Sequence, residues 1–152
     1  MQLLIFQAGN ARYGLDVRDI LEIAPLAACR ELPHAPPFVL GLLNYQGCAV
    51  PVIDVVALLT GIRANALLST RLILVRYRAA NEAKVVGLVA EKAIETIRCE
   101  SHDIQPPALL IPDAPWIGGT ITTKDGLIQC VTVHSLLGKQ EHAALFATKE
   151  AA

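Results

Sequence analysis

The stretch LPHAPPFVLGLLNYQGCAVPVIDVVALL, residues 32–59, decides how the rest of the chain is interpreted. Three prolines among its first six residues forbid regular ladder pairing and fix an extended or turning path. From Leu40 to Val55 the pattern predicts a strand, a turn at Asn44–Gly47 and a second strand. The stretch carries almost no charge and no evident catalytic group. It is therefore either plain core or a surface that another protein covers.

Short strands are predicted on both sides of this stretch. The alternating run ARYGLDV (11–17) follows QLLIFQAGN (2–10), whose final Gly-Asn is a turn signal, so the two runs form a hairpin. Further strands are predicted in DILEIAPLA, which Pro25 stops, and in the regions 70–78 and 83–100, which a polar link separates. A last hairpin is expected around Lys124-Asp125-Gly126, and a helix of useful length over residues 134–147.

Short strands separated by Gly and Pro, with one late helix, indicate a mostly β fold built from small barrels or a sandwich. About ten short strands are too many for one small barrel and suit two. A division between the two is expected near residues 79–84.

The composition argues against several classes of partner. The formal net charge is −1, and the 13 Lys and Arg residues form no basic stripe, so nucleic-acid binding is not expected. Hydrophobic residues make up 53% of the chain and charged residues 18%. This excess either leaves apolar surface for partners or reflects the many alanines. No run reaches the length of a membrane span and no signal peptide is apparent, so membrane insertion is not expected and a cytosolic location follows.

The titratable groups do not assemble into a predicted active site. Asp54 could act as an acid or base, but its position before VVALLTG, which Gly61 closes, suits a helix cap. None of the serines lies in a nucleophile elbow, and no phosphate-binding glycine loop is present. The sequence predicts no catalytic residues and no enzyme.

A metal site has one candidate pattern, Cys99-x-x-His102 with Cys130-x₃-His134. On a strand, the span from Cys130 to His134 is about 13 Å, far too long for both to reach one zinc at about 2.0–2.3 Å. We therefore expect no metal and no other cofactor, and a small metal-binding protein remains only as an alternative. The four widely spaced cysteines are expected to be buried small hydrophobes.

Glu22 differs from the other charges because its neighbours Ile20, Leu21 and Ile23 are all apolar. Two interpretations stay open. The side chain lies at a solvated edge, or it makes a polar contact to a nearby turn or to a partner.

Five segments together resemble the CheW-like domain of bacterial chemosensory adaptors along almost the whole chain. They are FQAGNARYGLDVRDILEI, LPHAPPFVLGLLNYQGCAVPVIDV, TRLILVRYR, VVGLVAEKAIETI and IGGTITTKDGLIQCVTVHSLL. The most specific part runs from Pro33 to Asp54 as Pro-x-x-Pro-x-Φ-Φ-x-Gly-Φ-Φ-Asn-x-x-Gly-x-Φ-Φ-Pro-Φ-Φ-Asp, where Φ is apolar.

The resemblance implies a single CheW-like domain over residues 1–152, made of two small five-stranded SH3-like barrels packed together, with a short C-terminal helix. The first barrel is expected over residues 11–80. The second is expected over residues 81–133 together with the N-terminal strand 1–8.

The implied role is that of a non-catalytic adaptor in the cytoplasm, at membrane-associated receptor arrays. It would join the cytoplasmic tip of a chemoreceptor to the regulatory domain of a CheA-type histidine kinase. The implied receptor-binding candidates are Ile20, Glu22, Gly41, Asn44, Gln46 and Gly47. No kinase-binding residues are assigned.

One departure from the family pattern concerns the turn. Family members usually carry Arg two residues after the Asn, and this arginine resembles a partner for the acidic residue that matches Glu22. Here Gln46 takes its place. A glutamine can still donate a hydrogen bond, but it is neutral and has no bidentate fork. The change suggests a divergent array with an output other than swimming, such as surface sensing, or a scaffold of the same fold that binds a single partner.

Overall fold

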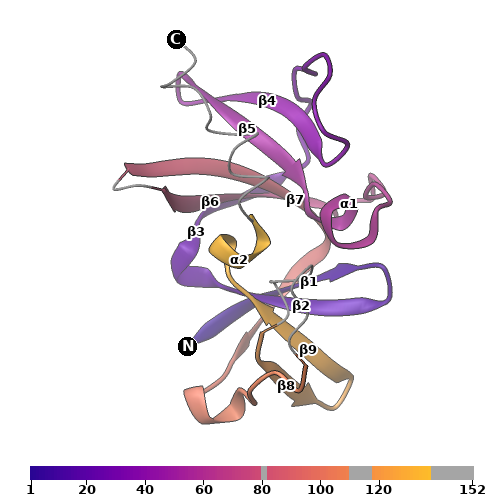
Figure 1. The fold of residues 1–152 in the computed structure, drawn as a ribbon, viewed down its shortest axis with the longest axis vertical. Coiled ribbons are helices and arrows are strands. Elements are labelled where there is room, and N and C mark those ends of the chain that lie inside the picture. The colour runs from indigo at the N-terminus through magenta and orange to yellow at the C-terminus, as the bar shows by residue number, and fades with distance from the viewer. Residues whose placement is uncertain (80–81, 110–117, 138–152) are drawn as a thin grey trace.

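Strands dominate the computed structural model, which describes residues 1–79, 82–109 and 118–137 (Figure 1). The strands are β1 (Gln2–Ala8), β2 (Ala11–Asp16), β3 (Ile20–Pro25), β4 (Val39–Tyr45), β5 (Cys48–Asp54), β6 (Arg71–Ala79), β7 (Glu82–Arg98), β8 (Thr120–Thr123) and β9 (Gly126–Val131). The helices are α1 (Val55–Thr60) and α2 (Val133–Leu136), with single 3₁₀ turns η1 (Val17–Asp19) and η2 (Ser101–Asp103). The prediction of a mostly β fold is confirmed.

Two sets of strands share β7. In the first set the order is β3-β6-β7-β5-β4, and in the second it is β7-β1-β2-β9-β8. Each set therefore has five strands, because β7 counts in both. In Figure 1 the hairpin of β4 and β5 lies at one end of the molecule and β8 and β9 lie at the other. Across the described residues the nine strands form one continuous sheet, and neither set is a closed ring.

β7 changes partners at its middle. Its first part pairs with β6 as far as Ala90, and from Glu91 onward it pairs with β1. The register along β1 shifts at this point, and Lys92 there has φ 50°. An irregularity of this kind bends a strand and increases its twist. A single 17-residue strand can therefore serve both sets.

The local hairpin predictions are confirmed, and the strand pairings can be set beside the division expected from the sequence. Ala8 pairs with Ala11 in the first hairpin and Thr123 with Gly126 in the last. However, β2, which was expected in the first barrel, pairs with β1 and, in parallel, with β9. The expected division near residues 79–84 falls within the β6–β7 hairpin, where Ala79 pairs with Glu82. Parallel and shared pairings depend on contacts far apart in sequence, which local patterns do not report.

The helix expected over residues 134–147 is observed only in part. α2 covers Val133–Leu136, and Thr132 caps it by accepting a hydrogen bond from the Ser135 amide. Residues 138–147 of the predicted helix lie outside the described residues. No helix among those described is long and apolar enough to cross a membrane.

Alternation along the strands places apolar side chains in three clusters. On β1, Leu3 and Ile5 belong to a small cluster within the second set, whereas Leu4 and Phe6 face a large central cluster. On β5, Val52 belongs to a cluster within the first set, and its neighbour Ile53 faces the central one. Many strands are thus buried on both faces. This burial uses a large share of the apolar residues that the composition shows.

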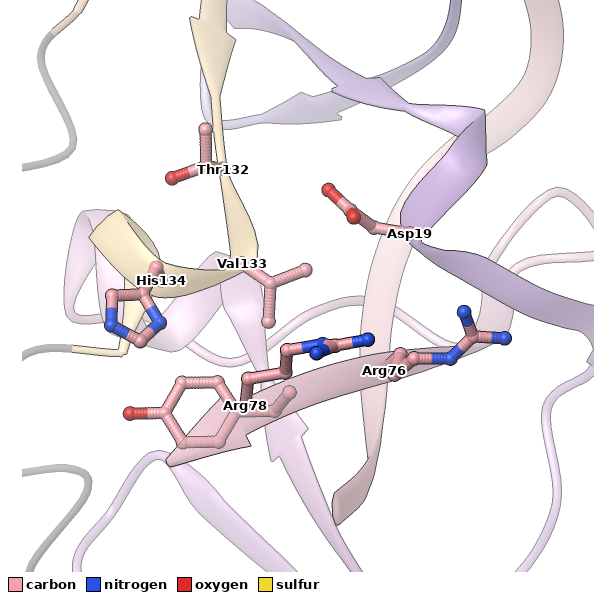
Figure 2. A pocket seen from close by; sticks show the side chains of 7 residues that line it. Asp19, Arg76, Arg78, Thr132, Val133 and His134 are labelled. Carbon is pink, nitrogen blue, oxygen red and sulfur yellow. The ribbon is translucent and has the colours of Figure 1, made fainter. Parts of the chain in front are cut away.

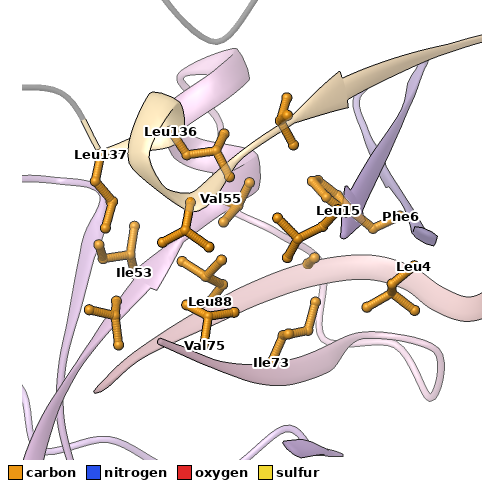
Figure 3. Close-up of a cluster of buried hydrophobic side chains, with 14 of the residues drawn as sticks. Leu4, Phe6, Leu15, Ile53, Val55, Ile73, Val75, Leu88, Leu136 and Leu137 are labelled. Atoms are coloured by element: carbon orange, nitrogen blue, oxygen red, sulfur yellow. The ribbon is translucent and has the colours of Figure 1, made fainter. Parts of the chain in front are cut away.

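The central cluster joins the two sets. It draws Leu4, Phe6 and Leu15 from β1 and β2 against residues of β5, β6 and β7, and α2 covers it with Leu136 (Figure 3). Its remaining buried members are Ile53, Val55, Ile73, Val75, Tyr77, Val86, Leu88, Ala90, Ala93, Val131, Val133 and Leu137. The two sets are therefore packed together through one shared apolar layer.

The helix-cap interpretation of Asp54 is confirmed, and this side chain yields a test of stability. Asp54 is 2% exposed; its Oδ1 accepts from the Ala57 amide at 3.0 Å and its Oδ2 from the Ala64 amide at 2.8 Å. Asp54→Ala leaves both amides without an acceptor, so we expect the free energy of unfolding to fall by about 2–4 kcal/mol in urea denaturation. Asp54→Asn keeps one acceptor oxygen and should lose about half as much. Equal losses in the two variants would contradict this role.

Candidate functional site

The turn between β4 and β5 is a tight, internally bonded structure. Tyr45 and Cys48 form its last strand pair, and Gln46 and Gly47 between them have φ 51° and 84°. Positive φ at both central residues is typical of a type I′ hairpin turn, which matches the twist of the flanking strands. Asn44 Oδ1 accepts a hydrogen bond from the Gly47 amide at 3.0 Å. Asn44 therefore holds the turn, and Gln46 and Gly47 are exposed at its tip.

Glu22 lies close to this turn although it comes from β3. Its side chain is exposed, and it follows a register shift between Ile20 and Glu22 in the pairing of β3 with β6. The pKa of Tyr45 is raised by burial, by the negative charge of Glu22 and by a side-chain hydrogen bond to Glu22. Among the described residues, the turn residue beside Glu22 is therefore Tyr45 rather than Gln46. This supports the interpretation of Glu22 as a contact to a nearby turn.

Gly41 has a structural role inside the fold. It is buried with φ 142°, and a Cβ at this position would lie 2.1 Å from the carbonyl oxygen of Arg30. The backbone of Arg30 passes there because it pairs with Leu42 through hydrogen bonds of 2.8 and 2.9 Å. Gly41 therefore combines a positive φ with room for a second stretch of the chain's own backbone.

The six candidates therefore divide into two groups. Glu22, Asn44, Gln46 and Gly47 gather at one exposed surface, which we call the turn surface and to which Tyr45 also belongs. Gly41 is covered, and Ile20 is half-buried against the central cluster.

Sequence reasoning missed two features of this surface. Tyr45 stood inside the quoted motif, but nothing in its pattern linked it to a residue 23 positions earlier. Leu21 and Ile23, the neighbours of Glu22 along β3, are also exposed, at 39% and 43%. The apolar run around Glu22 was the signal that could have indicated these exposed apolar side chains.

Among the described residues, the cysteines and histidines do not gather into a metal centre. No group of three His, Cys, Asp or Glu residues able to hold a metal occurs in the ranges that the structure describes. Burial raises the pKa of the thiols of Cys29, Cys99 and Cys130, which keeps them protonated and poorly reactive. Cys99 is buried as expected, whereas Cys48 is exposed beside the turn, contrary to the expectation of burial.

Comparisons with known proteins agree on one family. The family model for the CheW-like domain matches residues 2–141. The chain is 26% identical to the chemotaxis protein CheW of Rhizobium meliloti over 145 residues, which cover 94% of this chain and 91% of that protein. It is 28% identical to protein FrzA of Myxococcus xanthus over 108 residues, covering 71% and 65% of the two chains.

A solved structure shares the fold. The crystal structure of the scaffolding protein TtCheW from Thermoanaerobacter tengcongensis matches with a TM-score of 0.77 at 25% sequence identity. The match covers 92% of this chain and 89% of that one.

The two glycines of the motif should respond differently to a methyl group. Gly41→Ala forces Cβ against the Arg30 carbonyl and breaks the Arg30–Leu42 pairing, so we expect a loss of about 3 kcal/mol or more in the free energy of unfolding. Gly47→Ala meets no atom within 4 Å and has only the strain of φ 84°, about 1 kcal/mol. Thermal denaturation of both variants measures the difference, and a similar loss at the two positions would refute the role given to Gly41.

Removing the charge of Glu22 should be visible at Tyr45. Glu22→Gln eliminates the negative charge and the carboxylate acceptor, so we expect the pKa of Tyr45 to fall toward its ordinary value. A pH titration followed by ¹³C NMR of the tyrosine Cζ atoms measures this shift. Tyr13 and Tyr77 are internal controls because burial alone raises their pKa values. An unchanged Tyr45 titration would mean that the contact with Glu22 is not formed in solution.

Proposed function

Because the chain belongs to the CheW-like domain family, we propose that it is a non-catalytic adaptor that couples a chemoreceptor to a CheA-type histidine kinase in a bacterial chemosensory array. The observation that carries this proposal is the family match over residues 2–141. Two of the three proteins named above are a chemotaxis protein and a scaffolding protein, which supports the same role. On this proposal the protein works in the cytoplasm, at receptor arrays next to the membrane.

The turn surface is the receptor-binding site in this proposal. It combines the exposed carboxylate of Glu22 with the exposed turn residues Asn44, Gln46 and Gly47. The Asn44–Gly47 hydrogen bond and the Arg30–Leu42 pairing fix the backbone on which the surface is built. A backbone that is ordered before binding loses less conformational entropy when a partner docks. Gly41 and Ile20 would contribute by holding this backbone.

Gln46 supports a divergent version of this role. Without an arginine at the tip, the carboxylate of Glu22 faces only the neutral Tyr45 hydroxyl among the described residues. We propose that the array differs in its receptor contact and has an output other than swimming, such as surface sensing. The second candidate, a scaffold that binds only one of the two partners, rests on the same residue.

Binding assays with both partners test the proposal. We expect the purified chain to co-sediment with a receptor signalling fragment and with a CheA-type kinase from its own organism, and to bind each one separately. Binding of the kinase alone would favour the single-partner scaffold, and binding of neither would refute both candidates.

The variant Gln46→Arg tests the turn surface itself. A guanidinium can form a bidentate contact with a carboxylate, so we expect receptor affinity to rise by about three- to tenfold, with kinase affinity unchanged. Gln105→Arg is the matched control because it adds the same charge to an exposed residue that bridges to Thr120, far along the chain from the turn. If both variants bind the receptor as the parent chain does, the turn surface has no part in the contact.

A further inference from the structure

A hollow of about 280 Å³ lies between the end of β6, η1 and the beginning of α2, apart from the turn surface. Its walls include Asp19, Arg76, Arg78, Thr132, Val133 and His134 (Figure 2). These residues come from three segments that are widely separated in sequence. The volume is below the roughly 300–1,000 Å³ of clefts that enclose drug-sized ligands, and it suits one or two side chains.

The hollow is lined by two arginines, Arg76 and Arg78, whose side chains have no acidic partner among the described residues. Arg76 and Arg78 are exposed and stand two residues apart on β6, so they project from the same face of the strand. Neither side chain takes part in an ion pair or hydrogen bond within the described part of the chain, whereas the side chain of Arg12 pairs with Glu95 and that of Arg18 with Asp16. In Figure 2 the Arg78 guanidinium extends beneath Val133 into the middle of the hollow, and Arg76 lies toward its rim.

His134 and Asp19 complete the polar lining from opposite sides. The ring of His134 stacks on Tyr77 with centroids 5.3 Å apart, and this contact orients the imidazole at the edge of the hollow. Asp19 faces it from η1 (Figure 2). The hollow therefore offers hydrogen-bond donors from Arg78 and His134 and an acceptor from Asp19.

We propose that this hollow binds an acidic side chain, with its adjoining backbone, from an extended segment of a protein partner. The partner's carboxylate pairs with the Arg78 guanidinium, with Arg76 adding charge at the rim. A backbone N–H of the same segment donates to Asp19.

The presence of Asp19 favours a peptide over inorganic phosphate. A peptide segment supplies both an acidic side chain that accepts from Arg78 and a backbone amide that donates to the carboxylate of Asp19. A phosphate dianion offers mainly acceptors, and the negative charge of Asp19 repels it. Because the arginines are exposed, the contact is weak in isolation and gains strength as part of a larger interface.

This site goes beyond the receptor–kinase coupling proposed above and does not depend on it. The turn surface is built on β3 and the β4–β5 hairpin, whereas the hollow uses Arg78 and residues next to α2. Failure of the coupling experiments would leave the hollow's affinity for acidic peptides untouched, and the reverse also holds.

The test uses the full ¹⁵N-labelled chain and a five-residue blocked peptide with glutamates at positions two and four among alanines. At low ionic strength we expect saturable shifts at residues 76–78 and 132–134, with a dissociation constant on the order of millimolar. The same peptide with glutamines should cause none. Equal shifts with the glutamine peptide, or shifts with inorganic phosphate but not with the glutamate peptide, would overturn the proposal.

Three variants locate the contact. Arg78→Gln should weaken binding of the glutamate peptide by about tenfold, and Arg76→Gln by about threefold. Asp19→Asn keeps an acceptor oxygen but removes the opposing charge, so binding should strengthen by about twofold. Arg63→Gln, a loss of the same charge on the exposed segment after α1, is the matched control and should change nothing. Equal weakening by Arg63→Gln and Arg78→Gln would indicate general charge attraction and contradict the site.

Discussion

The shared apolar layer between the two sets of strands is the constraint on which the rest of the structure depends. Strands β1, β5, β6 and β7 each send one face into this layer and the other into a smaller cluster. Because these strands carry apolar side chains on both faces, they have little contact with water. This burial of apolar surface is the strongest contribution to the stability of a chain of this size. Once the layer is formed, the hairpins, turns and short helices at its margins are held in fixed places.

This arrangement gives the apolar composition a different meaning from the one that the sequence first suggested. The 53% hydrophobic content was attributed either to partner surfaces or to alanines. Much of it instead fills strands that are buried on both sides, such as the consecutive Leu72, Ile73, Leu74 and Val75 of β6. Exposed apolar side chains remain, including Leu21 and Ile23, but they do not form the bulk of the excess.

What the sequence predicted correctly was local. The Gly9-Asn10 and Lys124–Gly126 turns, the Asp54 cap and the Gly61 helix end follow from residue types whose preferred backbone angles or side-chain bonds act within a few positions. The parallel pairing of β2 with β9 and the sharing of β7 could not be predicted in this way. Alternation shows that a strand has buried faces but not which strand lies beside it.

The same limit applies to the prediction of functional sites. The turn residues were found through a family motif, whereas Tyr45 next to Glu22 and the hollow around Arg78 join segments that only the folded chain brings together.

The order of the strands along the chain has a further consequence for how such a protein can change over generations. β1 and β2 precede the strands β3 to β6, and β8 and β9 follow them, so the first set is an insertion within the second. No single crossover point separates the two halves, and β7 would be divided by any exchange that tried to do so. Recombination between relatives can therefore replace the whole unit or individual loops. The two halves must instead diverge together, because substitutions near Ala90 and Glu91, where β7 changes partners, affect both.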